Sequence, residues 1–151
     1  MTAAARRTVV LVRHAKAESG EERSDHDREL TGRGRRAATE AGHWLASHVP
    51  APELVWCSSA LRALQTWQGM APALSPVEVV VARDLYLASA AEVVDRVQRA
   101  DARTMVVVGH NPTIEQALVS LSGEMRGMRP GAAAMVDLDA GRLVELWEPP
   151  R

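Results

Sequence analysis

The fold of this chain is decided by the run VVLVRHAKAE, residues 9–18. Its first four residues are branched and apolar, which is typical of a short strand buried on both faces at the centre of a parallel sheet. Arg13 and His14 follow the strand directly. Ligands of open α/β sheets bind outside the carboxyl ends of the strands, so this pair is interpreted as an anion-holding guanidinium beside a reactive imidazole. An Arg-His pair can also be the polar start of an ordinary loop.

Working outward from this strand, apolar runs alternate with segments of helical spacing. We expect a helix over 30–49 with Thr31 as N-cap, and then strands over 54–58, 77–81 and 104–109, each followed by a helix. Two further runs, 132–138 and 143–147, predict a hairpin. This order predicts an α/β fold: a three-layer sandwich with a mainly parallel sheet, helices on both faces and the C-terminal hairpin at its edge.

Two strand ends repeat the pattern of the first. Arg62 falls near the start of the helix after 54–58, where backbone amides and a guanidinium can hold an anion together, while Leu61, Leu64 and Ala71 are expected to face the core. His110 follows the strand 104–109. The four strand ends are therefore expected to bring Arg13, His14, Arg62 and His110 to one rim of the sheet.

The helix after His110 is expected to use Asn111 as N-cap and Pro112 as its first residue. Segment 83–87 is expected to be a loop. The polar segment 15–29 starts at the Arg-His pair, so Arg28 could fold back over the site, although a mixed charge run is most often a solvated loop.

Composition limits the classes of function. The chain has 151 residues, which suits one domain over 1–151, and its formal net charge of −1 offers no global field for nucleic acid or an anionic membrane. No segment approaches membrane-spanning length, and the single cysteine, Cys57, suits a reducing compartment. We therefore expect a cytoplasmic protein without nucleic-acid or membrane partners. The sequence leaves the oligomeric state open.

Three blocks of sequence resemble the histidine phosphatase superfamily with its phosphoglycerate mutase-like fold, and within it the short SixA-like phosphohistidine phosphatase branch. They are LVRHA at 11–15, SALRALQT at 59–66 and VGHNP at 108–112, in the order and rough spacing of that family. The resemblance implies that His14 is the nucleophile, that Arg13 and Arg62 bind phosphate, and that His110 contacts the phosphoryl oxygens. Arg28 resembles a further arginine that short members place before their first helix.

The chemistry of phosphoryl transfer agrees with these roles. The reaction needs an in-line nucleophile and positive charge around three equatorial oxygens. The expected intermediate is a phosphohistidine on His14, which water then hydrolyses. No cofactor is expected. A zinc site is not expected either, because no nearby Cys, Asp or Glu completes a ligand set with His14 and His110.

The general acid is the uncertain part of the site. Larger relatives supply an acidic group after the third strand, where this chain has Asp84, and Asp84 is either that group or an ordinary surface residue. An alkoxide leaving group needs a proton donor, whereas an imidazole can depart already protonated. A missing acid therefore favours a phosphohistidine or another phosphoramidate as substrate, with a phosphohistidine protein as the partner.

Three alternatives remain open at this point. One is a general small-molecule phosphomonoesterase of the same superfamily, and another is a non-catalytic phosphate-binding module. The third is a cysteine phosphatase that uses Cys57. Such enzymes place five residues between cysteine and arginine, whereas four residues, 58–61, separate Cys57 from Arg62.

Overall fold

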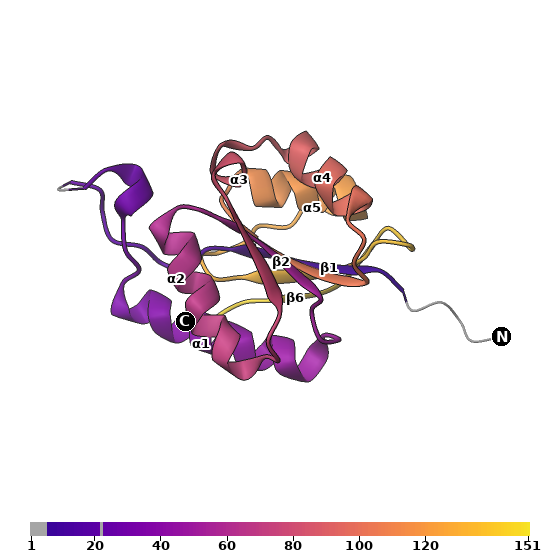
Figure 1. The fold of residues 1–151 in the computed structure, drawn as a ribbon, viewed down its shortest axis with the longest axis horizontal. Helices are drawn as coiled ribbons and strands as arrows, with labels where there is room; N and C mark the ends of the chain where they lie inside the picture. Colours follow the sequence, from indigo (N-terminus) through magenta and orange to yellow (C-terminus); the bar gives the residue numbers. More distant parts are fainter. Residues whose placement is uncertain (1–5, 22) are drawn as a thin grey trace.

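The computed structural model describes residues 6–21 and 23–151, and it contains a six-stranded sheet with helices on both faces (Figure 1). Residues 1–5 and 22, which the predicted domain over 1–151 includes, lie outside the described part. The strands are β1 Thr8–Arg13, β2 Leu54–Ser58, β3 Glu78–Ala82, β4 Thr104–Gly109, β5 Ala133–Asp137 and β6 Arg142–Trp147. The helices are α1 Gly32–His48, α2 Leu61–Met70, α3 Arg83–Leu87, α4 Ala90–Arg99 and α5 Thr113–Ser122, with 3-10 turns at Asp25–Asp27 and Ala71–Ala73.

The sheet order is β3-β2-β4-β1-β5-β6, which places β1 well inside the sheet. Strands β3, β2, β4 and β1 are parallel, while β5 and β6 add an antiparallel hairpin at one edge. The predicted fold class is thereby confirmed. Because parallel strands end on the same side, the residues that follow β1, β2 and β4 meet at one rim.

The side chains of β1 alternate between two cores. Val9 and Leu11 pack with residues of α4 and α5, whereas Val10 and Val12 pack with residues of α1 and α2. Figure 1 shows the same two layers, with α1 and α2 on one face of the sheet and α3, α4 and α5 on the other. Covered on both sides, β1 is the rigid base from which Arg13 and His14 project.

One local prediction is wrong and another holds only in part. The prediction that Leu61, Leu64 and Ala71 face the core holds in part: Leu64 and Ala71 pack against it and are partly buried, whereas the fully buried face of α2 includes Ala63, Thr66, Trp67 and Met70. Arg62, in the first turn of α2, is buried as well. Segment 83–87 is the short helix α3 rather than a loop.

The start of α5 also differs from its prediction. The helix begins at Thr113, and Pro112 is its cap. Asn111 lies before the cap, where its Oδ1 accepts a hydrogen bond from the backbone N–H of Glu115 at 3.3 Å. Asn111 thus still accepts from a free N–H of the first turn, although it lies one residue before the cap and not at the cap.

The chain after His14 is held against the start of α1. Thr31, the predicted N-cap, accepts a hydrogen bond from the N–H of Gly34, and its own N–H donates to the Lys16 carbonyl at 2.9 Å. A Cβ on Gly34 would lie 2.2 Å from that carbonyl oxygen. The approach of α1 to the segment after His14 therefore requires glycine at position 34.

We expect Gly34→Ala to lower the free energy of unfolding by about 1–3 kcal/mol, because the new methyl group forces backbone apart. Gly32→Ala is the matched control, since its Cβ would meet only the end of the Arg36 side chain at 3.6 Å. That control should be neutral or stabilising by up to about 1 kcal/mol. Urea unfolding of both variants measures the difference, and equal stability would contradict the close approach.

Candidate active site

The predicted rim exists. Arg13 pairs with Gly109 in the β1–β4 register, and the N–H of His14 donates to the Gly109 carbonyl at 3.0 Å, which sets His14 beside His110. Arg62 reaches the same place from the first turn of α2. A cavity of about 280 Å³ is lined by all four predicted residues and by Arg28, together with Ala15, Lys16, Ala17, Asn111 and Pro130.

The contacts of His14 fix which ring nitrogen carries the proton. Nδ1 lies 2.9 Å from the carbonyl oxygen of Ala15, which can only accept, so Nδ1 is the donor. Nε2 lies 3.2 Å from Nε of Arg62, which can only donate. Burial, aided by the charges of Arg62 and Arg13, lowers the pKa of His14 to about 3. The ring is therefore neutral near pH 7, and its Nε2 lone pair faces the guanidinium.

His110 has the opposite arrangement of donor and acceptor. Its Nδ1 lies 3.4 Å from Nη2 of Arg62 and accepts, so Nε2 carries the proton and donates to Ser58 Oγ at 2.7 Å. Burial and the nearby Arg62 lower the pKa of His110 to about 4. The ring centres of His14 and His110 are 5.1 Å apart. Both rings thus present a lone pair to one guanidinium.

Arg62 is the centre of this cluster, with only 5% of its surface exposed. Its backbone carbonyl accepts a hydrogen bond from Thr66 Oγ1 at 2.7 Å, and the same hydroxyl accepts from the N–H of Ala15 at 3.0 Å. This link ties the first turn of α2 to the residue after His14. The guanidinium is therefore held in a fixed position relative to the imidazole.

The two other predicted arginines line the same cavity. Arg13 donates from Nη1 to the Met128 carbonyl at 2.8 Å, and its buried Nε has no hydrogen-bond partner among the described residues. Arg28 donates to Asp25 Oδ1 at 3.2 Å and to the Glu18 carbonyl at 3.0 Å. The loop that carries Arg28 does fold back over the rim.

The acidic residue at the site is Asp25, which the sequence analysis did not select. Its carbonyl accepts from Arg62 Nη1 at 2.6 Å, and its Oδ2 accepts from Arg62 Nη2 at 3.0 Å. Oδ2 also accepts from the Tyr86 hydroxyl at 2.6 Å. The hydrogen bond from Tyr86, with the charges of Arg62 and Arg28, lowers the pKa of Asp25 to about 2. Asp25 is therefore a carboxylate, and not a proton donor, near pH 7.

Asp84, the residue considered as a general acid, does not line this cavity. It forms an ion pair with Arg96 at 2.9 Å and lines a different cavity beside Trp56. The residue of the segment 83–87 that reaches the site is Tyr86. Ser58, at the end of β2, was also missed, although inspecting every polar residue at a strand end would have found it.

Cys57 is unsuited to be a nucleophile. It is fully buried among the residues that pack under α1 and α2, and burial raises the pKa of its thiol to about 12. The structure therefore weighs against the cysteine phosphatase alternative. Within residues 6–21 and 23–151, no group of three His, Cys, Asp or Glu side chains is arranged to hold a metal ion.

The lowered pKa values predict how stability depends on pH. His14 and His110 bind a proton near pH 6.5 when unfolded but only near pH 3 and 4 when folded, so the unfolded chain takes up protons first. We expect the free energy of unfolding to fall as the pH is lowered from about 6.5 towards 4. The pKa of Asp25 is also lowered, but its effect lies below about pH 4.

Urea unfolding at about pH 7 and about pH 5 measures this loss. In His14→Gln, where one titrating ring is absent, the decline should be shallower. A decline as steep as in the unaltered protein would show that His14 is not held neutral.

The comparisons with known proteins agree with the fold and the geometry. The family model of the histidine phosphatase superfamily (branch 1) matches residues 9–86, and the chain belongs to this superfamily. A structure from Nakamurella multipartitia, assigned as a phosphohistidine phosphatase SixA, is 35% identical, with 98% of this chain and 99% of that chain covered and a TM-score of 0.83. The corresponding protein of Agrobacterium tumefaciens is 27% identical, with 95% and 99% covered and a TM-score of 0.86.

Two further similarities are informative. The protein histidine phosphatase SixA in complex with tungstate is 25% identical, with 94% of this chain and 97% of that chain covered and a TM-score of 0.82. An uncharacterized protein of Mycobacterium tuberculosis is 38% identical over 117 residues, which cover 74% of this chain and 72% of that protein. The predicted resemblance to SixA-like histidine phosphatases is thereby confirmed. In the described chain, no helix combines the length and the apolar character needed to cross a bilayer.

Proposed function

We propose that the protein is a phosphatase that hydrolyses phosphohistidine, or another phosphoramidate, through a covalent phosphohistidine on His14. The observation that carries this proposal is the neutral His14 ring, whose Nε2 lone pair faces Arg62 while Nδ1 is held by the Ala15 carbonyl. A nucleophile for phosphorus needs this protonation state and this neighbouring charge. The SixA structure with tungstate, a tetrahedral oxyanion, supports a phosphoryl site in the same fold.

In the first step, Nε2 of His14 forms a bond to phosphorus as the bond from phosphorus to the leaving group breaks. Arg62 and Arg13, with Arg28 at the rim, stabilise the charge on the equatorial oxygens. His110 contacts the same oxygens from the other side of Arg62. Water then attacks phosphorus, the bond from phosphorus to Nε2 breaks, and inorganic phosphate and neutral His14 are released. No metal or cofactor takes part in this scheme.

The environment of the carboxylates supports the phosphoramidate substrate. No Asp or Glu of the described chain lines the 280 Å³ cavity, and Asp25, which contacts Arg62 beside it, is ionised. His110 is neutral near pH 7, and its ring proton is bonded to Ser58. An alkoxide leaving group would therefore find no strong acid, whereas an imidazole can leave with its own proton.

We expect a phosphohistidine peptide to be hydrolysed with a kcat/KM roughly 10²-fold or more above that of sugar phosphates, since general acid catalysis is worth about that much. A turnover panel of phosphohistidine, aryl phosphate, sugar phosphate and nucleotide measures the ratio, with His14→Ala as the blank. Faster hydrolysis of sugar phosphates would instead indicate a general phosphomonoesterase. Binding without turnover of any of them would indicate a phosphate-binding module.

A further inference from the structure

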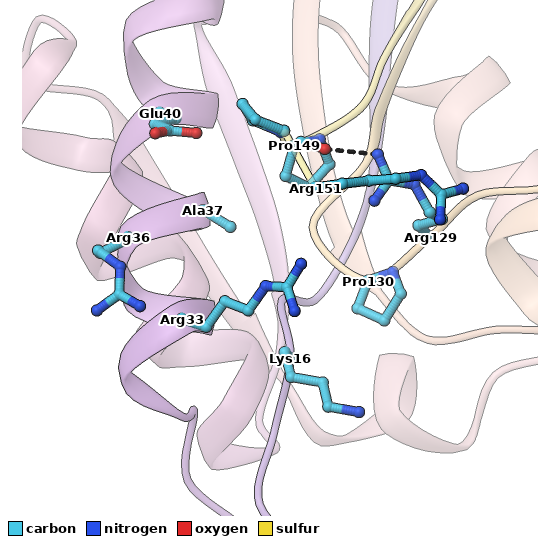
Figure 2. Close-up of a pocket in the computed structure, with 10 residues that line it drawn as sticks. Lys16, Arg33, Arg36, Ala37, Glu40, Arg129, Pro130, Pro149 and Arg151 are labelled. Atoms are coloured by element: carbon cyan, nitrogen blue, oxygen red, sulfur yellow. Dashed lines mark hydrogen bonds between the residues drawn. The ribbon is translucent and has the colours of Figure 1, made fainter.

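A second cavity, of about 450 Å³, adjoins the catalytic one. Lys16 and Pro130 line both cavities. Figure 2 shows its two walls: Arg33, Ala37 and Glu40 on α1, and on the other side the segments that contain Arg129–Pro130 and Pro149–Arg151. Arg33 and Glu40 are seven residues apart on the helix, so this wall is about 10 Å long. We call this space the basic groove.

The groove is strongly positive, although the chain as a whole has a formal net charge of −1. Its lining contains five basic side chains, of which Arg129 is paired with Glu148, and one acidic side chain, Glu40. Within the described part of the chain, neither Lys16 nor Arg33 lies in an ion pair with a carboxylate. In Figure 2 the Arg33 guanidinium extends into the space between the walls, whereas Arg36 turns away from it. The positive charge is therefore local and is available to a ligand.

The wall opposite α1 is held in place. Arg129 donates to Glu148 at 2.6 Å and to the Pro149 carbonyl, the contact drawn as a dashed line in Figure 2. Pro130 and Pro149 restrict the backbone here, because proline fixes φ. Pro149 is buried, and Gly131 beside it has a φ of +88°. The groove is thus bounded by a fixed wall rather than by loose surface side chains.

These features select one kind of ligand. A phosphohistidine in the catalytic cavity belongs to a peptide chain, which has to leave that cavity over its rim. Lys16 lies on this rim and also lines the basic groove, so the peptide chain can continue from the rim into the groove. An extended peptide advances about 3.3 Å per residue, so a wall of about 10 Å accommodates roughly three residues. Several separate cations along such a wall match carboxylate side chains better than they match a single compact anion.

We propose that the basic groove binds an acidic segment of the phosphorylated protein, next to its phosphohistidine. This inference rests on the proposed function, and it specifies which residues of the substrate protein lie next to the phosphohistidine. Lys16 and Arg33 contact the acidic residues nearest the phosphoryl group. Glu40, at the other end of the α1 wall, limits the acidic stretch to the few positions next to the phosphohistidine.

The test compares two phosphohistidine peptides. In the acidic peptide, the three positions on one side of the phosphohistidine are Asp or Glu. In the neutral peptide, the same positions are the corresponding amides, Asn or Gln. A peptide pair is made for each side. At low salt, we expect kcat/KM to be about tenfold higher for the acidic peptide of one pair, and the preference to shrink as salt is added. Arg33→Glu should bring the ratio of the two kcat/KM values close to one. A glutamate in the first turn of α1 suits the helix dipole, so this variant should fold.

Arg142→Glu is the matched control, because it makes the same change of charge at an exposed position at the far end of the sheet. It should keep the preference for the acidic peptide. Equal turnover of both peptides in both pairs, or a preference that survives Arg33→Glu, overturns the groove assignment alone. If no phosphohistidine peptide is hydrolysed at all, the proposed function itself has failed.

Discussion

His14→Ala is expected to lower turnover of a phosphohistidine peptide by roughly 10⁴-fold or more, the scale of loss seen when a nucleophile is removed. His110 also presents a lone pair to Arg62, with its Nδ1 3.4 Å from Nη2, so this variant tests which of the two rings attacks phosphorus. The variant should also lose the covalent intermediate. Rapid quenching of the unaltered protein with labelled substrate should capture a phosphoryl group that is stable in alkali and labile in acid, as expected of a phosphohistidine.

Cys57→Ser is the control for this experiment. The thiol is buried in the core with its pKa raised to about 12, and it lies outside the catalytic cavity, so turnover should stay within about twofold. Covalent label that persists in His14→Ala, or disappears in Cys57→Ser, would refute the assignment of His14.

Arg62→Ala should lower kcat/KM by about 10²–10³-fold, which corresponds to about 2.7–4 kcal/mol, as for other charged or polar donors aimed at developing charge. The side chain faces Nε2 of His14 and Nδ1 of His110 at the same time, so its loss removes both the proposed phosphate ligand and the group that contacts the two rings. Affinity for tungstate should fall in parallel, because a ground-state oxyanion uses the same donors.

Two variants sharpen this prediction. Arg62→Lys keeps the charge but cannot supply the planar set of donors, so its activity should lie between that of the unaltered protein and that of Arg62→Ala. Arg96→Ala removes an arginine that stacks on Trp56 and pairs with Asp84, away from the site, and should leave activity unchanged. Circular dichroism checks that each variant is folded. Unaltered tungstate affinity in Arg62→Ala would contradict its role as the oxyanion ligand.

The parts of the site that could be predicted follow from a rule of topology. Arg13, His14 and His110 come directly after apolar runs, and parallel strands carry the residues at their ends to one rim whatever their separation in sequence. The prediction needed only the positions of the strands. Arg62 followed from the same reasoning, although the most buried face of α2 was not identified, because it carries the polar residues Arg62 and Thr66.

The parts that could not be predicted depend on contacts between loops. Asp25 lies in a charge-rich segment whose composition favours solvent, and only the tertiary fold brings it to Arg62 and Tyr86. Asp84 was the candidate acid after the third strand, but the short helix α3 turns Tyr86 toward the site instead. The helix propensity of five residues is too weak to predict a helix as short as α3 from the sequence.

The contact between Asp25 and Arg62 has a consequence for the end of the catalytic cycle. A phosphoryl group that uses Nη1 and Nη2 of Arg62 has to displace the Asp25 carboxylate and carbonyl, which bind the same donors. Asp25 thus acts as an intramolecular competitor of inorganic phosphate. This competition should weaken the binding of inorganic phosphate, so we expect accumulated phosphate to inhibit the protein only weakly.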